Sequence, residues 1–202
     1  MMQLSYFYYT FDKAIPPRIC NEMMALLKKS KKKLGTLGGL ENENKPVDLE
    51  IRHSTVAFDS SWWLYRWTHP FIHEANKVGK WNFQWNHSEA CQLTEYKPGG
   101  FYHWHKDQMD GPYDDKEVKW AQGKIRKLSS VVSLNEGTEY TGGELEFYSH
   151  RFAKKPWHQT CKPMKNKGSI VVFPSFMWHR VMPVKTGVRY SLTNWHLGDP
   201  FV

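Results

Sequence analysis

The sequence predicts an α+β fold that is mainly β, with a β core preceded by supporting helices. Three observations predict this class. Six short segments bounded by turn residues follow one another after residue 90, a spacing typical of a sandwich, a jelly roll or a barrel. Two segments with helical spacing precede them. Aromatic residues make up 15% of the chain, and their wide rings suit the space between packed sheets.

Length and composition favour one globular domain over residues 1–202. Hydrophobic residues make up 40% of the chain and charged residues 24%, which is typical of a folded rather than a disordered protein. The sequence contains no internal repeat and no low-complexity linker. We therefore expect residues 1–89 to form a helical support region and residues 90–197 to form the β core.

The support region begins with an aromatic segment, residues 5–11, which predicts a short strand. A Pro-Pro pair then opens a helix, because proline is favoured in a first helical turn. The segment Gly35–Lys45 is a loop by its composition. A second helix is expected over Thr68–Val78, with Thr68 as its N-cap and Pro70 in its first turn.

The expected strands of the β core are short and are separated by glycine-rich or polar turns. The turns include Pro98-Gly99-Gly100 and Gly142-Gly143, whose residues favour tight chain reversals. The strands are expected at Cys91–Tyr96, Leu128–Leu134, Glu144–Tyr148, Ser169–Phe173, His179–Pro183 and Val188–His196.

The chain is basic, with a formal net charge of +8 and a pI near 9.3. This balance favours acidic partners such as nucleic acid, an acidic protein or a small carboxylate. Part of the excess is local, since five lysines lie together at Lys28, Lys29 and Lys31 to Lys33. We interpret this patch as a solvated helix end and loop.

The three cysteines, Cys20, Cys91 and Cys161, contain no C-x-x-C pair. They therefore indicate neither a structural zinc site nor a disulfide framework, and reduced thiols are expected. The first residues lack the basic and apolar regions of a signal peptide, and no segment reaches the length of a membrane span. These features predict a cytoplasmic protein that does not contact membranes.

Three residues have the chemistry of a metal site. On an extended segment, His105 and Asp107 would point to the same face, because side chains alternate with a period of two. His179 follows in a later segment. Two histidines and one carboxylate form the facial triad of non-haem iron(II) oxygenases, which leaves coordination positions open.

Arg189 is the candidate for binding an anion beside this metal. We expect residues 179–183 and 188–196 to pair as a hairpin, which would place His179 opposite Ser191 and Arg189 on the same face. A guanidinium group and a hydroxyl near a metal form a receptor for a carboxylate. An inward arginine also needs an anionic partner, because an unpaired buried charge is costly.

Taken together, these residues resemble the prolyl 4-hydroxylase-type 2-oxoglutarate oxygenases, and the smaller bacterial and phage-encoded members are closest in style. The resemblance rests on the segment from Tyr96 through His105 to Asp107, on Gly142-Gly143-Glu144-Leu145, and on Gly168 through His179 to Ser191. It covers about residues 90–197. It implies a double-stranded β-helix (jelly-roll, cupin-like) core with iron at its mouth.

The resemblance also implies individual roles. His105, Asp107 and His179 match the iron ligands, and Arg189 matches the residue that pairs with the 5-carboxylate of 2-oxoglutarate. Ser191 and Tyr96 match further co-substrate contacts. Where the family often has Tyr-Leu-Asn, this chain has Ser133-Leu134-Asn135, so no phenol is available at Ser133. Iron(II) and 2-oxoglutarate are the implied cofactor and co-substrate, and ascorbate is a further candidate.

The activity implied by the resemblance is hydroxylation of a C–H bond, most readily of a prolyl residue in a protein or peptide, with succinate and CO2 as co-products. Tyr102, Trp104 and Trp178 are candidates for lining the substrate mouth. The same chemistry on a free amino acid or another small molecule remains open, and so does a non-enzymatic β-core binding module. A nucleic-acid dealkylase is disfavoured, because its R-x-N-x-x-x-x-x-R pattern is missing after His179.

Overall fold

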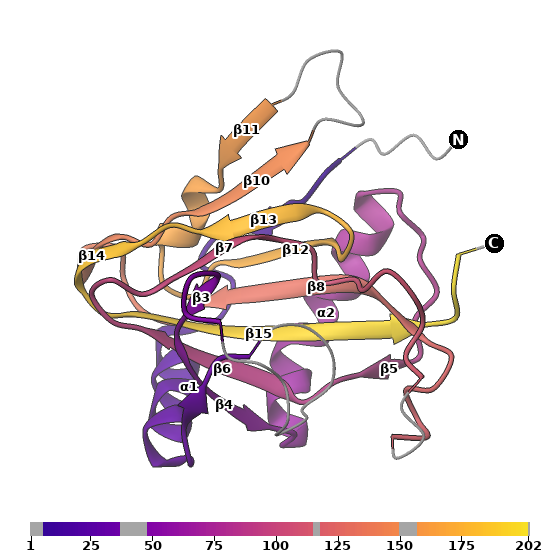
Figure 1. The fold of residues 1–202 in the computed structure, drawn as a ribbon, viewed down its shortest axis with the longest axis horizontal. Helices are drawn as coiled ribbons and strands as arrows, with labels where there is room; N and C mark the ends of the chain where they lie inside the picture. Colours follow the sequence, from indigo (N-terminus) through magenta and orange to yellow (C-terminus); the bar gives the residue numbers. More distant parts are fainter. Residues whose placement is uncertain (1–5, 37–47, 115–117, 150–156, 202) are drawn as a thin grey trace.

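The computed structural model describes residues 6–36, 48–114, 118–149 and 157–201. Within these residues, two antiparallel sheets lie one above the other and a two-stranded ribbon joins them at one end (Figure 1). The prediction of a mainly β fold with supporting helices is confirmed. Most of the predicted loop Gly35–Lys45 lies outside the described residues.

The larger sheet combines strands from both parts of the chain. Its central strand, β15 (Arg189–Gly198), pairs with β8 (Ile125–Ser133) on one side and β6 (Cys91–Tyr96) on the other. The outer strands are β12 (Ile170–Pro174) and β1 (Tyr9–Phe11) beyond β8, β4 (Thr55–Asp59) and β2 (Lys33–Leu34) beyond β6, and β5 (His87–Ser88), which also pairs with β15.

The smaller sheet has the strand order β11, β10, β13, β7, β3. These strands span Trp157–Thr160, Leu145–Ser149, Trp178–Val181, Phe101–His105 and Arg52–His53. The ribbon consists of β9 (Tyr140–Gly142) and β14 (Val184–Gly187). A short 3-10 helix, η1, covers Lys162–Lys165.

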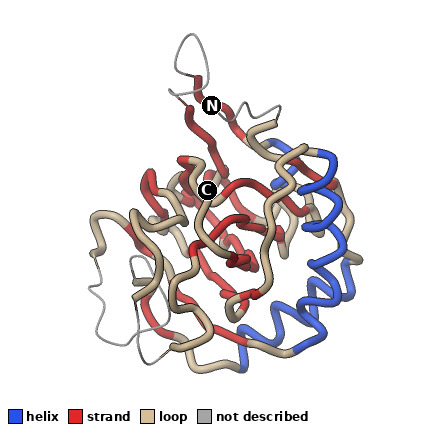
Figure 2. Tube along the Cα trace, turned by 90° about the vertical axis from the view of Figure 1, so that its right-hand side faces the viewer, coloured by secondary structure: helices blue, strands red, loops and turns tan. Residues whose placement is uncertain are grey.

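Two helices cover the outer face of the larger sheet, along one side of the strands (Figure 2). The first, α1 (Pro17–Lys29), begins as predicted, and its buried face carries Ile19, Met23 and Leu27. The second is α2 (Trp62–Val78). Neither helix in the described part of the chain is long and apolar enough to cross a membrane.

The predicted start of the second helix at Thr68 is wrong. The helix begins at Trp62, and Pro70 lies in its interior rather than in its first turn. Thr68 is fully buried, and its hydroxyl donates to the carbonyl of Leu64 one turn earlier. This is how a threonine inside a helix satisfies its hydroxyl, whereas an N-cap threonine would bond forward. Proline is a weaker boundary signal here than the apolar face that continues through it.

The apolar interior has two main layers. One lies between the helices and the larger sheet and includes Leu93, Leu128 and Leu192. The other lies between the two sheets and includes Phe147 and Phe173, whose rings meet edge to face at 5.0 Å. The layer between the sheets gives way to polar side chains where β7, β13 and β15 approach one another. The candidate site lies there.

The expected division into a helical support region and a separate β core is too simple. Residues before 90 supply β1, β2, β4 and β5 to the larger sheet and β3 to the smaller one. β1 lies within residues 5–11, where a short strand was predicted, whereas β2, β3 and β5 are each two residues long, too short for an alternating pattern to mark them in the sequence. The first part of the chain therefore extends both sheets as well as covering one of them.

Candidate metal centre

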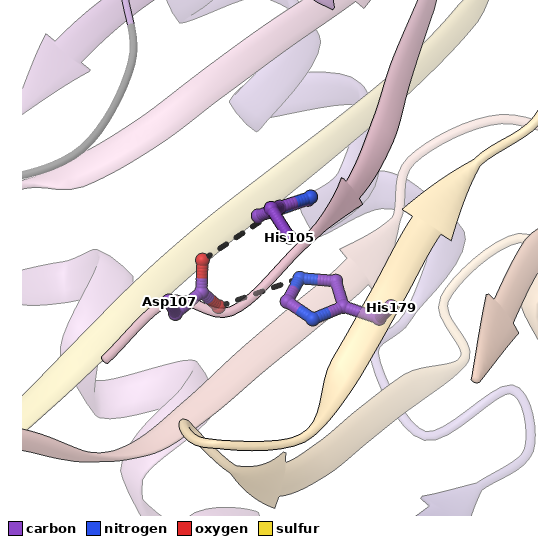
Figure 3. A group of neighbouring side chains, drawn as sticks. All are labelled: His105, Asp107 and His179. Atoms are coloured by element: carbon purple, nitrogen blue, oxygen red, sulfur yellow. Dashed lines mark ion pairs between the residues drawn. The ribbon is translucent and has the colours of Figure 1, made fainter. Parts of the chain in front are cut away.

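Three side chains, two from strands of the smaller sheet and one from the segment after β7, meet in the space between the sheets. His105 ends β7, Asp107 follows two residues later, and His179 lies on β13 directly opposite His105. Their ligand atoms all lie within 4.8 Å of one another. Figure 3 shows the three side chains pointing toward one another, with dashed lines from the Asp107 carboxylate to each of the two imidazole rings.

The distances fit a carboxylate shared between two imidazole nitrogens. Oδ1 of Asp107 lies 3.8 Å from Nε2 of His105, and Oδ2 lies 3.6 Å from Nε2 of His179. Both pairs are longer than direct hydrogen bonds. An ion that is held by all three groups would fill this separation.

The backbone fixes which nitrogen of each histidine faces the centre. Nδ1 of His105 lies 2.7 Å from the carbonyl of His103, and Nδ1 of His179 lies 2.9 Å from the carbonyl of Met177. A carbonyl can only accept, so each Nδ1 carries the proton and each Nε2 presents its lone pair. Second contacts of this kind orient metal-binding histidines in proteins.

The protonation states agree with this arrangement. Burial lowers the pKa of His105 well below its usual value, so this ring stays neutral. Burial alone would raise the pKa of Asp107, but His179, His105 and Arg126 outweigh it, and the pKa is lowered. A neutral imidazole and an ionised carboxylate are the forms that bind a divalent metal.

Asp107 reaches the centre in a way that the sequence did not predict. It does not lie on a strand, because β7 ends at His105. Instead, a turn carries it inward, and the backbone amides of Asp107 and Gln108 both donate to the carbonyl of Ser175. The prediction that His105 and Asp107 lie side by side is therefore correct, but they are brought together by the segment after β7 and not by alternation along one strand.

The three side chains offer the donor atoms that a bound metal ion would require. Oδ2 of Asp107 is buried and has no hydrogen-bond partner. A buried carboxylate oxygen without a partner is costly, and a cation at this point would satisfy it. Nitrogen and oxygen donors without thiolate suit iron(II) better than structural zinc.

Arg189 faces this centre from the opposite sheet. The predicted hairpin between residues 179–183 and 188–196 is wrong, because β13 pairs with β10 and β7 whereas β15 pairs with β6 and β8. The residues between them form β14, which pairs with β9. His179 and Arg189 nevertheless line the same pocket, because the two sheets face each other across it.

The pocket lies between the two sheets and is lined by side chains from both. Arg189 is only 1% exposed, and its Nη1 donates to the hydroxyl of Ser191 at 3.3 Å. Its Nη2 is buried without a partner, and its guanidinium carbon lies 5.3 Å from the centre of the Tyr96 ring. Tyr96 and Arg189 are also register partners of β6 and β15. This end of the pocket can receive a carboxylate.

Other lining residues divide into expected and unexpected ones. Tyr102 stacks on the His105 ring at 3.5 Å, and burial raises its pKa to about 12, so it remains a neutral phenol. Thr193 and Trp195 continue the face of Arg189 along β15. Gln92 was not expected, although the alternation of β6 places it on the same face as Tyr96.

Trp104 and Trp178 do not line the pocket. Trp104 precedes His105, and Trp178 precedes His179, so both lie on the outer face of the smaller sheet. There the guanidinium of Arg180 lies 4.5 Å from the Trp104 ring, and Trp178 is 37% exposed. The side chain of His103 is exposed, and its role at the centre comes from its backbone carbonyl.

Comparison with known proteins identifies the family. The sequence profile of the 2OG-Fe(II) oxygenase superfamily matches residues 91–197, a little over half of the 202 residues. The chain belongs to this superfamily. The matched range begins at β6 and ends within β15, so it contains His105, Asp107, His179 and Arg189. The family uses Fe(II) and 2-oxoglutarate, which agrees with the His-Asp-His group.

Relatives of this chain include two bacterial proteins described as PKHD-type hydroxylases. One, from Crocosphaera subtropica, is 30% identical over 110 residues, which are 54% of this chain and 43% of that protein. The other, PiuC from Pseudomonas aeruginosa, is 28% identical over 138 residues, which are 60% of this chain and 54% of that protein. The chain thus spans about half the length of the curated relatives that it matches.

Solved structures share the fold of this chain over nearly its whole length. A Pseudomonas putida prolyl-4-hydroxylase aligns with a TM-score of 0.64 and 20% identity, covering 95% of this chain and 92% of that one. A Trichoplax adhaerens prolyl hydroxylase, solved with a peptide fragment of hypoxia inducible factor, aligns with a TM-score of 0.69 and 18% identity, covering 95% and 84%. The predicted double-stranded β-helix core is therefore confirmed.

Proposed function

We propose that this chain is an Fe(II)- and 2-oxoglutarate-dependent dioxygenase that hydroxylates a C–H bond, with a prolyl residue of a protein or peptide as its substrate. One observation carries the proposal. A His-Asp-His group, with Asp107 and His179 buried and His105 partly buried, and a buried arginine with an unpartnered nitrogen line a single pocket from opposite sides. A metal ion and a dicarboxylic acid together would satisfy both.

In this proposal, the side chains position groups and transfer no proton themselves. His105 and His179 would hold iron through Nε2 and Asp107 through its carboxylate. Bound iron and 2-oxoglutarate supply the oxygen chemistry, which yields succinate, CO2 and a hydroxylated substrate. No side-chain base or nucleophile is assigned, because none is needed.

Arg189, Ser191 and Tyr96 would hold the far carboxylate of 2-oxoglutarate. The side chain of Arg189 crosses the ring of Tyr96 and is fixed by Ser191, so its free Nη2 points in a defined direction. A guanidinium group in a water-poor pocket binds a carboxylate strongly, because little water competes. The stacked ring of Tyr102 would keep His105 in place beside the co-substrate.

The prolyl substrate is supported by the relatives and not by a feature of the pocket itself. Two fold neighbours are described as prolyl hydroxylases, and one of them was solved with a peptide. The curated relatives carry the broader description of PKHD-type hydroxylases. A protein or peptide substrate is therefore our first candidate, ahead of a free amino acid.

Succinate release tests this proposal and separates the substrate classes. The purified chain is incubated with Fe(II), 2-oxoglutarate and oxygen, together with proline-containing peptides, matched peptides with alanine for proline, or free amino acids. We expect release to depend on the prolyl peptide, and mass spectrometry to show the gain of one oxygen atom on proline. Release with free amino acids alone would contradict the peptide substrate, and no release from any class would contradict the enzyme.

A further inference from the structure

A buried ion pair lies next to the metal group, which consists of His105, Asp107 and His179. The pair includes none of these residues and none of the residues proposed to bind 2-oxoglutarate. Arg126 on β8 and Glu89, which precedes β6, are 4% and 6% exposed. Nε of Arg126 donates to Oε1 of Glu89 at 2.6 Å, and Nη2 donates to Oε2 at 2.5 Å. The two groups therefore form a bidentate fork, the strongest geometry of a guanidinium–carboxylate pair.

The carboxylate of this pair is rigidly held. The amide of Glu89 donates to the carbonyl of Trp195, and its own carbonyl accepts from Tyr65 and Asn194. The hydroxyl of Tyr113 donates to Oε1 of Glu89 at 3.0 Å. Glu89 is thus fixed to β15, to α2 and to the segment after Asp107, so it can hold Arg126 in one orientation.

The remaining nitrogen of Arg126 reaches a residue of the metal group. Its Nη1 lies 3.4 Å from the backbone carbonyl of Asp107. The guanidinium plane is supported by Trp195, whose ring centre lies 4.0 Å away and which lines the pocket. The amide of Asp107 already donates to Ser175. Asp107 is therefore fixed at both its amide and its carbonyl, although it lies beyond the end of β7.

Stability does not explain such a pair. Burying two charges costs several kcal/mol per ion, and apolar replacements of similar size are often neutral or stabilising. The pair is instead located where a ligand residue has no strand to hold it. We propose that Arg126, oriented by Glu89, is a positioning residue that holds Asp107 in the geometry needed to bind the metal. This inference rests on the function proposed above.

Mn(II) binding tests this role without turnover. The affinity of the full chain for Mn(II) is measured by electron paramagnetic resonance, and the melting temperature is measured without metal. In the double variant Glu89→Gln/Arg126→Met both charges are removed, so no unpaired charge stays buried. We expect a melting temperature close to that of the wild type and an affinity for Mn(II) that is roughly 10–100-fold weaker, as for other outer contacts of metal ligands.

A second ion pair provides the matched control. Arg180 on β13 donates from Nε to Oε2 of Glu146 on β10 at 2.7 Å, and this pair lies on the outer face of the smaller sheet. The variant Glu146→Gln/Arg180→Met is expected to bind Mn(II) within about twofold of the wild type, because the pair has no contact with Asp107. An equal loss in both double variants would overturn the positioning role.

A third variant covers the case in which the double variant does not fold. Arg126→Lys keeps the charge beside Glu89, but a single ammonium group cannot span both Glu89 and the Asp107 carbonyl. It should also weaken Mn(II) binding, and unchanged binding in this variant or in the folded double variant would overturn the inference. Failure of the wild type to bind Mn(II) better than His179→Ala would instead overturn the proposed function, and this inference with it.

Discussion

Among the described residues, histidines gather in two clusters, and only the one that contains His105 and His179 has the features of a metal centre. Behind the larger sheet, His196 of β15 lies near His69 and His73 of α2, with ring centres of His69 and His196 5.6 Å apart. The hydroxyl of Ser88 bridges Nε2 of His69 and Nδ1 of His196 at 3.1 and 2.9 Å. His73 stacks on Trp85.

The two clusters differ in where their ring nitrogens point. At the metal group, backbone carbonyls occupy both Nδ1 atoms and leave two Nε2 atoms facing one carboxylate. Behind the sheet, a hydroxyl occupies one nitrogen of each of two rings. Among the described residues, only the His105 group brings three ligand atoms together. Proximity of imidazoles therefore does not make a metal site, and convergence of free nitrogens on a carboxylate does.

The largest expected effect comes from removing a ligand of the first cluster. His179→Ala should lower the affinity for Mn(II) by more than roughly 100-fold, which is a larger loss than that expected when a residue that only contacts a metal ligand is changed. It should also abolish succinate release. His196→Ala, which removes a histidine of the second cluster, serves as the control in the same titration. Comparable loss of metal binding in the folded control would break the distinction between the clusters.

The second largest effect is expected at Arg189, which is proposed to bind the far carboxylate of 2-oxoglutarate beside the first cluster. Arg189→Ala should leave the affinity for Mn(II) nearly unchanged. It should weaken the binding of 2-oxoglutarate by at least about 2 kcal/mol, roughly thirtyfold, because a buried charge pair loses one partner. Isothermal titration of 2-oxoglutarate into the Mn(II)-loaded chain measures this. An unchanged dissociation constant would remove Arg189 from the site.

The second cluster should instead make the fold sensitive to pH. Burial, together with His69 and His73, lowers the pKa of His196 well below its usual value, and burial with His73 lowers the pKa of His69. The folded state therefore takes up protons less readily than the unfolded chain. The stability from these neutral rings is complete above about pH 6.5 and is lost as the pH falls below it.

Urea unfolding at pH 7.5 and 5.5 tests this dependence. Besides the histidines of the cluster, Tyr65 is in ring contact with His69. Burial raises the pKa of Tyr65, so its phenol is neutral at both pH values. We expect the free energy of unfolding to fall between the two values, and to fall less in His196→Gln. An equally steep fall in that variant would show that the cluster is not responsible.

The smallest effect is expected from the bridging hydroxyl. Ser88→Ala leaves one ring nitrogen of the partly buried His69 and one of the buried His196 without this partner, which should lower the free energy of unfolding by about 1–2 kcal/mol. Mn(II) affinity should not change, because Ser88 has no contact with the metal group. Denaturant unfolding and metal titration of one sample measure both quantities, and a parallel loss of metal affinity would contradict the separation of the clusters.

Much of the β core could be predicted because its strands carry local signals. Cys91–Tyr96 was predicted with its observed bounds, and the strand expected at Val188–His196 is β15, which runs from Arg189 to Gly198. Alternation and turn residues mark such strands whatever they pair with. The partners of β13 and β15 could not be found this way, because pairing across two sheets depends on contacts between distant segments.

The site shows the same limit. The residue types and motif order of His105, Asp107, His179 and Arg189 were sufficient to name them, and the structure brings them to one pocket. Glu89 and Arg126 have no such signal, since a buried ion pair looks like two surface charges in a sequence. Their contact with each other and with Asp107 arises only when β8 and the segment before β6 are brought together.

The proposed function and the role of Arg189 both require that one pocket binds a metal and a 2-oxo acid together. The most direct test adds 2-oxoglutarate to the Fe(II)-loaded chain without oxygen and records the visible spectrum. We expect the charge-transfer absorption of an iron-bound 2-oxo acid in the wild type, its loss in His179→Ala, and its appearance only at higher 2-oxoglutarate in Arg189→Ala. Absence of this band from wild-type protein that is shown to contain iron would contradict the claim.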